Sequence, residues 1–169
     1  MSPRVVLVGP PGAGKSTVGK RVAKRLGVGF RDTDADIVTT AGKPISEIFI
    51  DDGEEHFRAL ERQAVAVALD EHPGVLSLGG GAVLDAGTRE LLREHVVALL
   101  DVDLGHATQR VGLNRDRPVL ALNPRAQLKL LLEQRMPLYR EVATFTVDTS
   151  SRSLPQVVDA VLHALASRP

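Results

Sequence analysis

A glycine-rich segment near the start of the chain carries a lysine followed by two hydroxyl side chains. It reads GPPGAGKST and fits G-x-x-x-x-G-K-[ST], the phosphate-binding loop between a strand and a helix. In such a loop, successive N–H groups surround the phosphates, and the helix N-terminus adds its dipole. Lys15 would reach the β- and γ-phosphates, and the Ser16 hydroxyl would bind Mg²⁺. The motif predicts a nucleoside triphosphate site formed by Gly12, Ala13, Gly14, Lys15, Ser16 and Thr17.

Two stretches compete for the carboxylate that a bound metal ion would need. The run VVALLD ends in Asp101, the simple pattern of a buried strand followed by an acid, whereas FRDTD offers Asp32 and Asp34. A D-x-D in an extended stretch puts both side chains on one face, which suits one carboxylate for the metal and one for an acceptor. An aspartate that caps a helix would give the same letters. The pattern alone leaves these readings open.

Three consecutive glycines follow an apolar run in VLSLGGGAVL. Ordering a glycine costs more backbone entropy than ordering any other residue, so three in a row indicate a need for bare backbone. A tight turn from strand to helix would explain them. The close approach of a bound molecule to the backbone would also explain Gly79, Gly80 and Gly81.

The elements that must position these residues follow from the alternation of apolar runs with amphipathic stretches. This alternation is typical of an α/β fold with a mostly parallel sheet. We expect strands at Arg4–Val8, Val28–Arg31, Val75–Leu78, Val96–Leu100 and Thr144–Val147. We expect helices at about Lys15–Leu26, Glu54–Leu69 and Thr88–Arg93, and a last helix from about Pro155. Gly27 would end the first of these helices.

The composition disfavours several classes of protein. The chain contains no cysteine, which excludes disulfides, thiolate catalysis and cysteine metal sites, and its five histidines are scattered without ligand spacing. Lysine plus arginine equals aspartate plus glutamate at 21 each, and aromatic residues make up 3%, so nucleic-acid binding is disfavoured. No N-K-x-D guanine motif is present, which favours an adenine nucleotide.

The length and the hydrophobic pattern indicate one soluble domain. At 169 residues the chain fits a single domain. Its apolar runs are too short to span a bilayer, and the opening residues have no signal-peptide pattern. We therefore expect a cytoplasmic protein that acts as a monomer.

Taken together, the motifs resemble those of the shikimate kinase family, small P-loop kinases of aromatic amino acid biosynthesis. The resemblance rests on GPPGAGKST, DTD, R-x-x-E at Arg58 and Glu61, VLSLGGG and R-x-P-L-Y, and it extends from Val5 to about Val161. Such kinases are similar to nucleoside monophosphate kinases. The resemblance implies a three-layer α/β/α P-loop fold with a five-stranded parallel sheet. It also implies one kinase domain over 1–169, with a substrate-binding insertion at about 33–61 and a mobile lid at about 112–124.

The reaction implied by the resemblance is transfer of the γ-phosphoryl group of ATP to the 3-hydroxyl of shikimate. Asp34 would orient or deprotonate the attacking hydroxyl, while Lys15 and Arg117 would neutralise charge on the transferring group. Arg58 and Arg135 would bind the shikimate carboxylate, because a guanidinium pairs bidentately with a carboxylate. The partners would be these two small molecules, with no nucleic acid and no membrane.

The remaining implied roles concern the ring, the metal and the adenine. The backbone at Gly79, Gly80 and Gly81 would form a wall against the shikimate ring, with the Gly80 N–H in contact. Ser16 would bind Mg²⁺ directly and Asp32 through water, which leaves Asp101 a structural role. Further contacts to ATP are implied for Arg110, Arg117, Arg152 and Pro155.

Two other readings stay open. One is a different small-molecule P-loop kinase, such as a gluconate kinase, and the other is a nucleotide-binding module without catalytic activity. Phe49 and Phe57 resemble pocket-lining residues, although isolated aromatic side chains more often belong to a core.

Overall fold

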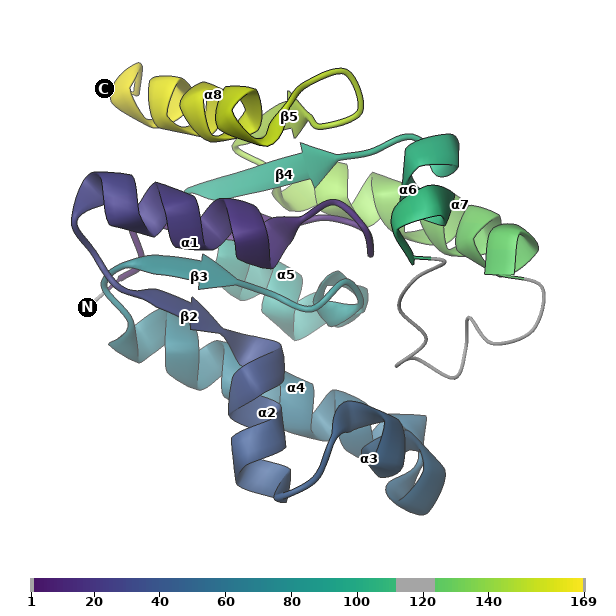
Figure 1. Cartoon of the computed structure of the whole chain (residues 1–169). Coiled ribbons are helices and arrows are strands. Elements are labelled where there is room, and N and C mark those ends of the chain that lie inside the picture. The colour runs from purple at the N-terminus through teal and green to yellow at the C-terminus, as the bar shows by residue number, and fades with distance from the viewer. Residues whose placement is uncertain (1, 112–123, 169) are drawn as a thin grey trace.

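A parallel sheet forms the centre of the computed structural model, which describes residues 2–111 and 124–168 (Figure 1). The strand order is β2-β3-β1-β4-β5, and each neighbouring pair is parallel. The strands are β1 (Val5–Val8), β2 (Phe30–Asp32), β3 (Val75–Ser77), β4 (Val97–Asp101) and β5 (Phe145–Asp148). The predicted five-stranded parallel sheet is confirmed, with strand ends shifted by at most two residues.

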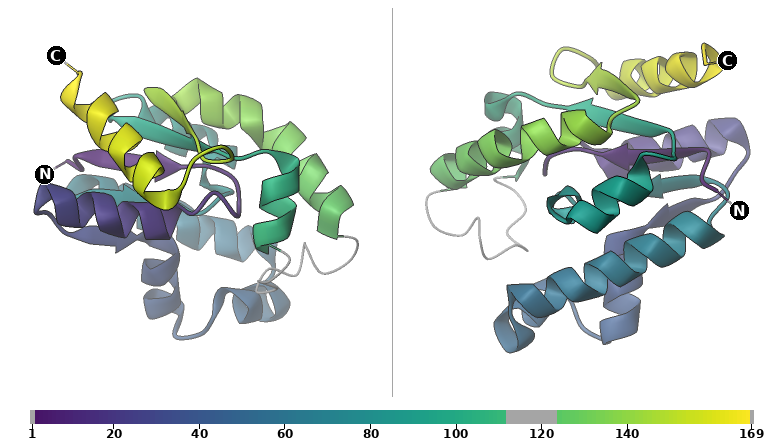
Figure 2. Two further views of the ribbon diagram at one scale, coloured as in Figure 1. Left: turned by 45° about the horizontal axis from the view of Figure 1, so that its top comes forward. Right: turned by 180° about the vertical axis from the view of Figure 1, so that it is seen from behind.

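Helices cover both faces of the sheet, as the two views in Figure 2 show. Because successive strand residues point to opposite faces, Val5 and Leu7 enter one apolar core while Val6 and Val8 enter the other. The first core packs against α1 (Lys15–Leu26), α6 (Leu104–Val111) and α8 (Leu154–Ala166). The second packs against α4 (Glu54–Glu71), α5 (Ala86–Leu92) and the end of α7 (Pro124–Val142). The three-layer α/β/α architecture is therefore confirmed.

Local capping explains where several elements differ from the sequence expectation. Gly27 ends α1 at φ 70°, as predicted, but the next residue also joins this cap, since the Val28 N–H donates to the Ala23 carbonyl at 3.0 Å. The second strand therefore begins at Phe30 rather than Val28. Similarly, the Asp85 carboxylate accepts from the backbone N–H of Thr88 at 2.8 Å, so α5 begins earlier than expected.

The segment between β2 and α4 folds into two short helices that the sequence analysis did not delimit. These are α2 (Thr33–Ala41) and α3 (Ile45–Asp52), which pack on α4 around a third apolar cluster (Figure 1). Phe49 and Phe57 belong to this cluster, with ring centroids 4.8 Å apart, and Phe57 is fully buried. Both aromatic residues therefore serve the core of the inserted segment.

Two further expectations concern the membrane and the lid. No helix in the described ranges 2–111 and 124–168 is long and apolar enough to cross a membrane. The predicted lid at about 112–124, with Arg117 in it, lies outside the described residues except for Pro124, where α7 begins.

Candidate active site

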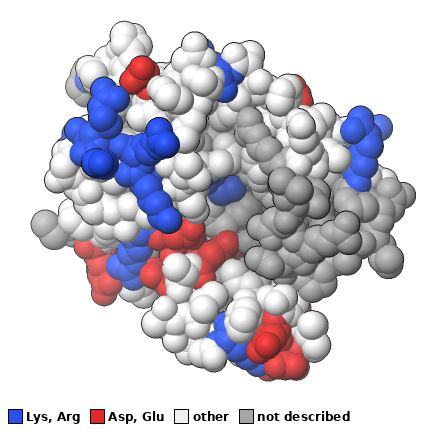
Figure 3. All heavy atoms as spheres, in the orientation of Figure 1, with Lys and Arg blue, Asp and Glu red and all other residues white. Residues whose placement is uncertain are grey.

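The phosphate loop, the DTD segment, the first two residues of the triple glycine and Arg135 meet around one hollow of about 450 Å³ at the carboxyl-terminal edge of the sheet. Arg58 and Gly81, which the sequence also assigned to the site, are not among the described residues that line it. This position follows from the topology, because β1, β2 and β3 are parallel neighbours whose ends lead into the phosphate loop, the DTD segment and the triple glycine. Figure 3 shows basic side-chain atoms deep in a hollow near the middle of this face, with acidic atoms along its lower rim. The lining residues are Pro11, Gly12, Gly14, Lys15, Ser16, Thr17, Asp32, Asp34, Ser77, Leu78, Gly79, Gly80 and Arg135.

The phosphate loop borders the hollow with the N-terminus of α1. Gly12 and Gly14 have φ angles of 84° and 82°, a left-handed conformation that favours glycine. Ala13 is buried within the loop, and its N–H donates to the Pro10 carbonyl at 3.2 Å. The ammonium of Lys15 donates to the carbonyls of Gly9 at 2.8 Å and of Pro10 at 3.1 Å, so it lies along the loop. This loop can bind an anion through its backbone and its lysine.

Asp32 caps α2 and also accepts a hydrogen bond from the phosphate loop. Its Oδ2 accepts from the Ser16 hydroxyl at 2.8 Å, and its Oδ1 accepts from the Asp34 N–H at 2.9 Å, which caps α2. Asp101, the competing acid, is not among the described residues that line the hollow. It lies at the end of β4, and its carbonyl accepts from the N–H and hydroxyl of Thr149 at 2.8 and 2.9 Å. The geometry therefore favours Asp32 as the metal-side carboxylate.

The triple glycine leaves space for side chains of the protein itself. A Cβ on Gly79 would lie 2.7 Å from Asp34 Oδ1 and 3.1 Å from Glu61 Oε2. A Cβ on Gly81 would lie 2.6 Å from Arg58 Nη2 and 2.7 Å from Arg58 Cζ. Contacts under 3.0 Å are too short for a real Cβ, and Gly81 has an ordinary φ of −98°. Glycine is required at these two positions for volume rather than for conformation.

Arg58 is held behind Gly81 by several contacts at once. Its Nη1 lies 2.8 Å from Glu61 Oε1, and the two side chains are 17% and 5% exposed. A weaker pair joins its Nη2 to Glu54 at 3.4 Å, and its guanidinium carbon lies 5.2 Å from the centre of the Phe57 ring. These contacts hold the Arg58 side chain in one conformation before a ligand binds. Binding would therefore cost little further rotamer entropy.

The second arginine reaches the hollow from α7. Arg135 is 9% exposed and lines the hollow directly, and its Nη1 would lie 3.6 Å from a Cβ on Gly80. The two predicted carboxylate-binding arginines thus lie against consecutive glycines, Arg135 beside Gly80 and Arg58 beside Gly81. Two guanidinium groups at one buried wall can bind an anionic group that comes against the glycines.

One residue next to the site ends the R-x-P-L-Y motif but was given no role from the sequence. The hydroxyl of Tyr139 donates to the Gly80 carbonyl at 2.6 Å, and the side chain is 1% exposed. The signal was present, because Arg135 and Tyr139 are four residues apart on a helix and share a face. A buried tyrosine hydroxyl also requires a partner.

Of the residues assigned to ATP binding outside the phosphate loop, the structure describes the side chains of Arg152 and Pro155. Arg110 belongs to α6, but its side chain lies outside the described residues. Arg152 is exposed in the turn between β5 and α8, and Pro155 is exposed in the first turn of α8. Ser153 caps that helix in a capping box with Gln156. Among the described residues, those that line the hollow include none from this turn.

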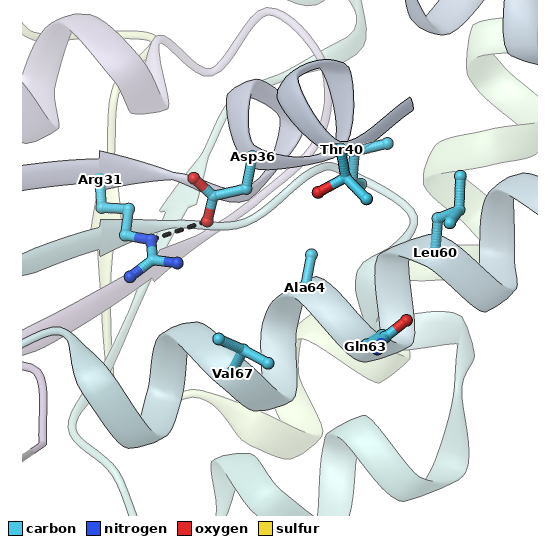
Figure 4. A pocket seen from close by; sticks show the side chains of 8 residues that line it. Arg31, Asp36, Thr40, Leu60, Gln63, Ala64 and Val67 are labelled. Carbon is cyan, nitrogen blue, oxygen red and sulfur yellow. Dashed lines mark hydrogen bonds and ion pairs between the residues drawn. The ribbon is translucent and has the colours of Figure 1, made fainter. Parts of the chain in front are cut away.

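A second, smaller hollow lies between β2, α2 and α4 (Figure 4). At one end, Arg31 Nε donates to Asp36 Oδ2 at 2.7 Å, and its Nη1 lies 3.4 Å from Glu71. The hydrogen bond that Arg31 donates to Asp36 is the main cause that raises the pKa of Arg31 above its usual value. Leu60, Ala64 and Val67 lie along its other side. The ion pair ties β2 to the start of α2 and to the end of α4.

Comparisons with known proteins agree with this geometry. A family model described as shikimate kinase matches residues 11–166. A shikimate kinase of Salinispora arenicola is 59% identical over 99% of this chain and 100% of its own length. One of Streptomyces coelicolor is 55% identical over 97% of this chain and 96% of its own length.

Solved structures point the same way. A shikimate kinase from Acinetobacter baumannii, solved in complex with shikimate, has a TM-score of 0.94 at 36% identity, covering 99% of this chain and 94% of its own. A gluconokinase from Sinorhizobium meliloti has a TM-score of 0.60 at 23% identity, covering 96% and 90%, and this likeness extends to the fold alone. The phosphate loop, the paired arginines and these matches together place the chain in the shikimate kinase family.

Proposed function

We propose that the chain transfers the γ-phosphoryl group of ATP to the 3-hydroxyl of shikimate, giving shikimate 3-phosphate and ADP. The observation that carries this proposal is the single hollow that a phosphate loop, the carboxylate of Asp34 and the guanidinium of Arg135 line together. Triphosphate and acceptor would meet there with their reacting atoms aligned. Alignment and charge neutralisation are what phosphoryl transfer mainly requires.

In this proposal Asp34 faces the attacking hydroxyl. The oxygen of that hydroxyl forms the new bond to phosphorus as the bond to the ADP oxygen breaks. Its proton leaves to the Asp34 carboxylate or, if Asp34 only orients the hydroxyl, to solvent. Lys15 adds positive charge from the phosphate-loop side.

The acceptor carboxylate would bind the two arginines. Arg58 and Arg135 lie against neighbouring glycines of the segment 79–81, which we call the glycine wall. A carboxylate bound by both arginines would hold the ring along this wall. The Gly80 N–H is the backbone donor we assign to that ring. Arg58 would enter this pairing already positioned by Glu61.

Mg²⁺ fits the donor set at the phosphate loop. The Ser16 hydroxyl and the Asp32 carboxylate are hard oxygen ligands that lie 2.8 Å apart, and the ion prefers such oxygens. No group of three or more acidic, histidine or cysteine residues able to hold a metal occurs within the described ranges. Ser16 as a direct ligand and Asp32 through water would suit an ion that is also bound by nucleotide phosphates. When bound, Mg²⁺ would neutralise phosphate charge.

Some assignments stay predictions from the sequence resemblance. These are the lid at about 112–124 with Arg117 as its catalytic residue, the ATP contacts of Arg110, Arg152 and Pro155, the single-domain organisation, the monomeric state and the cytoplasmic location.

The test is ADP release by the purified protein with Mg·ATP, measured alone and with shikimate, gluconate or nucleoside monophosphates. Turnover that depends on shikimate is expected. Turnover with gluconate or a nucleoside monophosphate instead would contradict the acceptor assignment and leave the phosphate loop intact. ATP binding without turnover on any acceptor would favour a nucleotide-binding module.

Two arginines four residues apart on α4 provide a matched pair of variants. Arg58→Lys keeps the charge but loses the planar fork, so the KM for shikimate should rise by about tenfold or more. Arg62→Lys is the control, because Arg62 is half-exposed and its nearest acid, Asp85, is 3.9 Å away. This control should keep the KM for shikimate of the unchanged chain. Equal effects in both variants would show that the arginine fork at position 58 is not used.

A further inference from the structure

The triple glycine is anchored by three consecutive carbonyl groups, and one of these depends on a side chain. The carbonyls of Gly79 and Gly81 accept from the backbone N–H groups of Ala82 and Leu84, each at 3.1 Å. The carbonyl of Gly80 instead accepts from the hydroxyl of Tyr139 at 2.6 Å. The middle of the glycine wall is thus held from α7.

These bonds determine where the glycine N–H groups point. A peptide unit is planar, so fixing its carbonyl also fixes the N–H of the next residue in the opposite direction. The Gly79 carbonyl orients the N–H of Gly80, and the Gly80 carbonyl orients the N–H of Gly81. Without a Cβ, glycine peptides rotate more freely than others, so the orientation needs such anchors. Tyr139 fixes the second of the two peptide planes that meet at Gly80.

The same helix face supplies the neighbouring cation. Arg135 precedes Tyr139 by one helical turn, and both side chains are buried against the glycine wall. A change in the Gly80 peptide would therefore alter the backbone donors and their spacing from the Arg135 guanidinium together. Precise spacing matters most for a ligand that contacts both groups.

We infer that Tyr139 is a positioning residue for the acceptor: its hydroxyl holds the Gly80 peptide so that the glycine wall and Arg135 present one fixed surface to shikimate. This inference rests on the proposed function. Tyr139 affects acceptor binding indirectly, through the positions of Gly80 and Arg135. Its loss should therefore weaken acceptor binding while leaving the phosphate loop as it is.

The decisive variant is Tyr139→Phe, which removes a single oxygen atom. We expect the KM and the dissociation constant for shikimate to rise about fivefold to tenfold, the effect typical of one lost hydrogen bond. The KM for ATP should change less than about twofold. Amide hydrogen exchange over 79–82 should become faster, because the Gly80 carbonyl loses its anchor.

Thr149→Val is the matched control. Thr149 is 2% exposed, and its hydroxyl also donates to a backbone carbonyl, that of Asp101, at 2.9 Å. The control loses one partly buried hydrogen bond from a side-chain hydroxyl to a backbone carbonyl, away from the glycine wall. It should leave shikimate binding and exchange over 79–82 unchanged. An equal loss of shikimate affinity in both variants would show that Tyr139 contributes only to the general stability of the protein, which would overturn the inference.

The outcomes separate this inference from the proposed function. If the unchanged protein does not use shikimate, the proposed function fails, and exchange over 79–82 still shows whether Tyr139 anchors the wall. If the unchanged protein uses shikimate and Tyr139→Phe keeps its shikimate KM, the inference is wrong, whatever the exchange data show.

A measurement on the unchanged sequence covers the case in which Tyr139→Phe does not fold. The chain has one tyrosine and no tryptophan, so incorporation of 3-fluorotyrosine gives a single ¹⁹F resonance from position 139. Titration with shikimate should shift this resonance with the dissociation constant found from binding. A resonance that does not move at saturating shikimate would overturn the inference.

Discussion

The phosphate loop and the glycine wall face one hollow, yet they use glycine for different reasons. In the phosphate loop, Gly12 and Gly14 have φ angles of 84° and 82°, and a Cβ on Gly14 would meet nothing within 4 Å. In the glycine wall, Gly81 has an ordinary φ of −98°, but a Cβ there would overlap Arg58. Gly12 and Gly14 need conformational freedom, whereas Gly81 needs empty volume.

This difference affects what a substitution would damage. An added methyl group at a left-handed position strains the backbone, and no neighbour can relieve the strain. An added methyl group at Gly81 instead displaces the end of the flexible Arg58 side chain, which moves a functional group. Substitutions in the phosphate loop should therefore mainly lower stability, whereas substitutions in the glycine wall should mainly weaken substrate binding.

The largest effect is expected for Gly9→Ala, at the entrance to the phosphate loop. A Cβ there would overlap the carbonyl oxygen of Leu100 on β4, and neither backbone can move without disturbing the sheet. The free energy of unfolding should fall by about 3 kcal/mol or more. Urea denaturation measures this loss. A loss below about 1 kcal/mol would mean that the strands adjust freely.

The next effect is on binding and concerns Gly81→Ala. The new methyl group would displace the Arg58 guanidinium and break its 2.8 Å contact with Glu61. The KM for shikimate should rise by about tenfold or more, with a smaller loss of stability than in Gly9→Ala and an unchanged KM for ATP. Steady-state kinetics with each substrate varied in turn tests this. A rise in the KM for ATP alone would contradict the distinction between the phosphate loop and the glycine wall.

A third variant isolates the cost of conformation. Gly27 ends α1 at φ 70°, far from the hollow, and a Cβ there would meet nothing within 4 Å. Gly27→Ala should lower the free energy of unfolding by about 1 kcal/mol, because of the left-handed φ alone. Both KM values should stay unchanged. A loss of unfolding free energy as large as that in Gly9→Ala would instead indicate a steric clash at this position.

The smallest effect concerns a turn held by side chains rather than by glycine. Asp148 accepts from the Ser151 hydroxyl and the Ser150 N–H, and these bonds lower the pKa of its carboxyl below the usual 3.8. A lowered folded-state pKa stabilises the protein above the unfolded value, and this contribution is lost as the pH falls through the folded value.

Because Asp148 is exposed, Asp148→Asn should cost only a few tenths of a kcal/mol at neutral pH. The difference from the unchanged protein should shrink below about pH 4, as the original carboxyl becomes protonated. Urea denaturation across pH 2.5–7 provides the measurement. A difference that grows toward acid pH would show that the sign is wrong.

The sequence by itself determined the features that consecutive residues create. GPPGAGKST forms the predicted loop, and α1 has the predicted bounds, because the signals for a strand end, a left-handed glycine and a helix start are all local. The alternation of apolar runs likewise predicted the parallel sheet. The helices α2 and α3 were not delimited because each is short, and their apolar residues are buried only in the cluster that α2, α3 and α4 form together.

The tertiary structure alone decided how distant residues share the site. It set Asp32 beside Ser16 and left Asp101 outside the lining of the hollow, although both acids follow strands in the sequence. It also brought Tyr139 to Gly80, fifty-nine positions away, and set Arg58 in the space that Gly81 leaves empty. Local patterns specify loops and elements, whereas volume and long-range hydrogen bonds exist only once those elements pack.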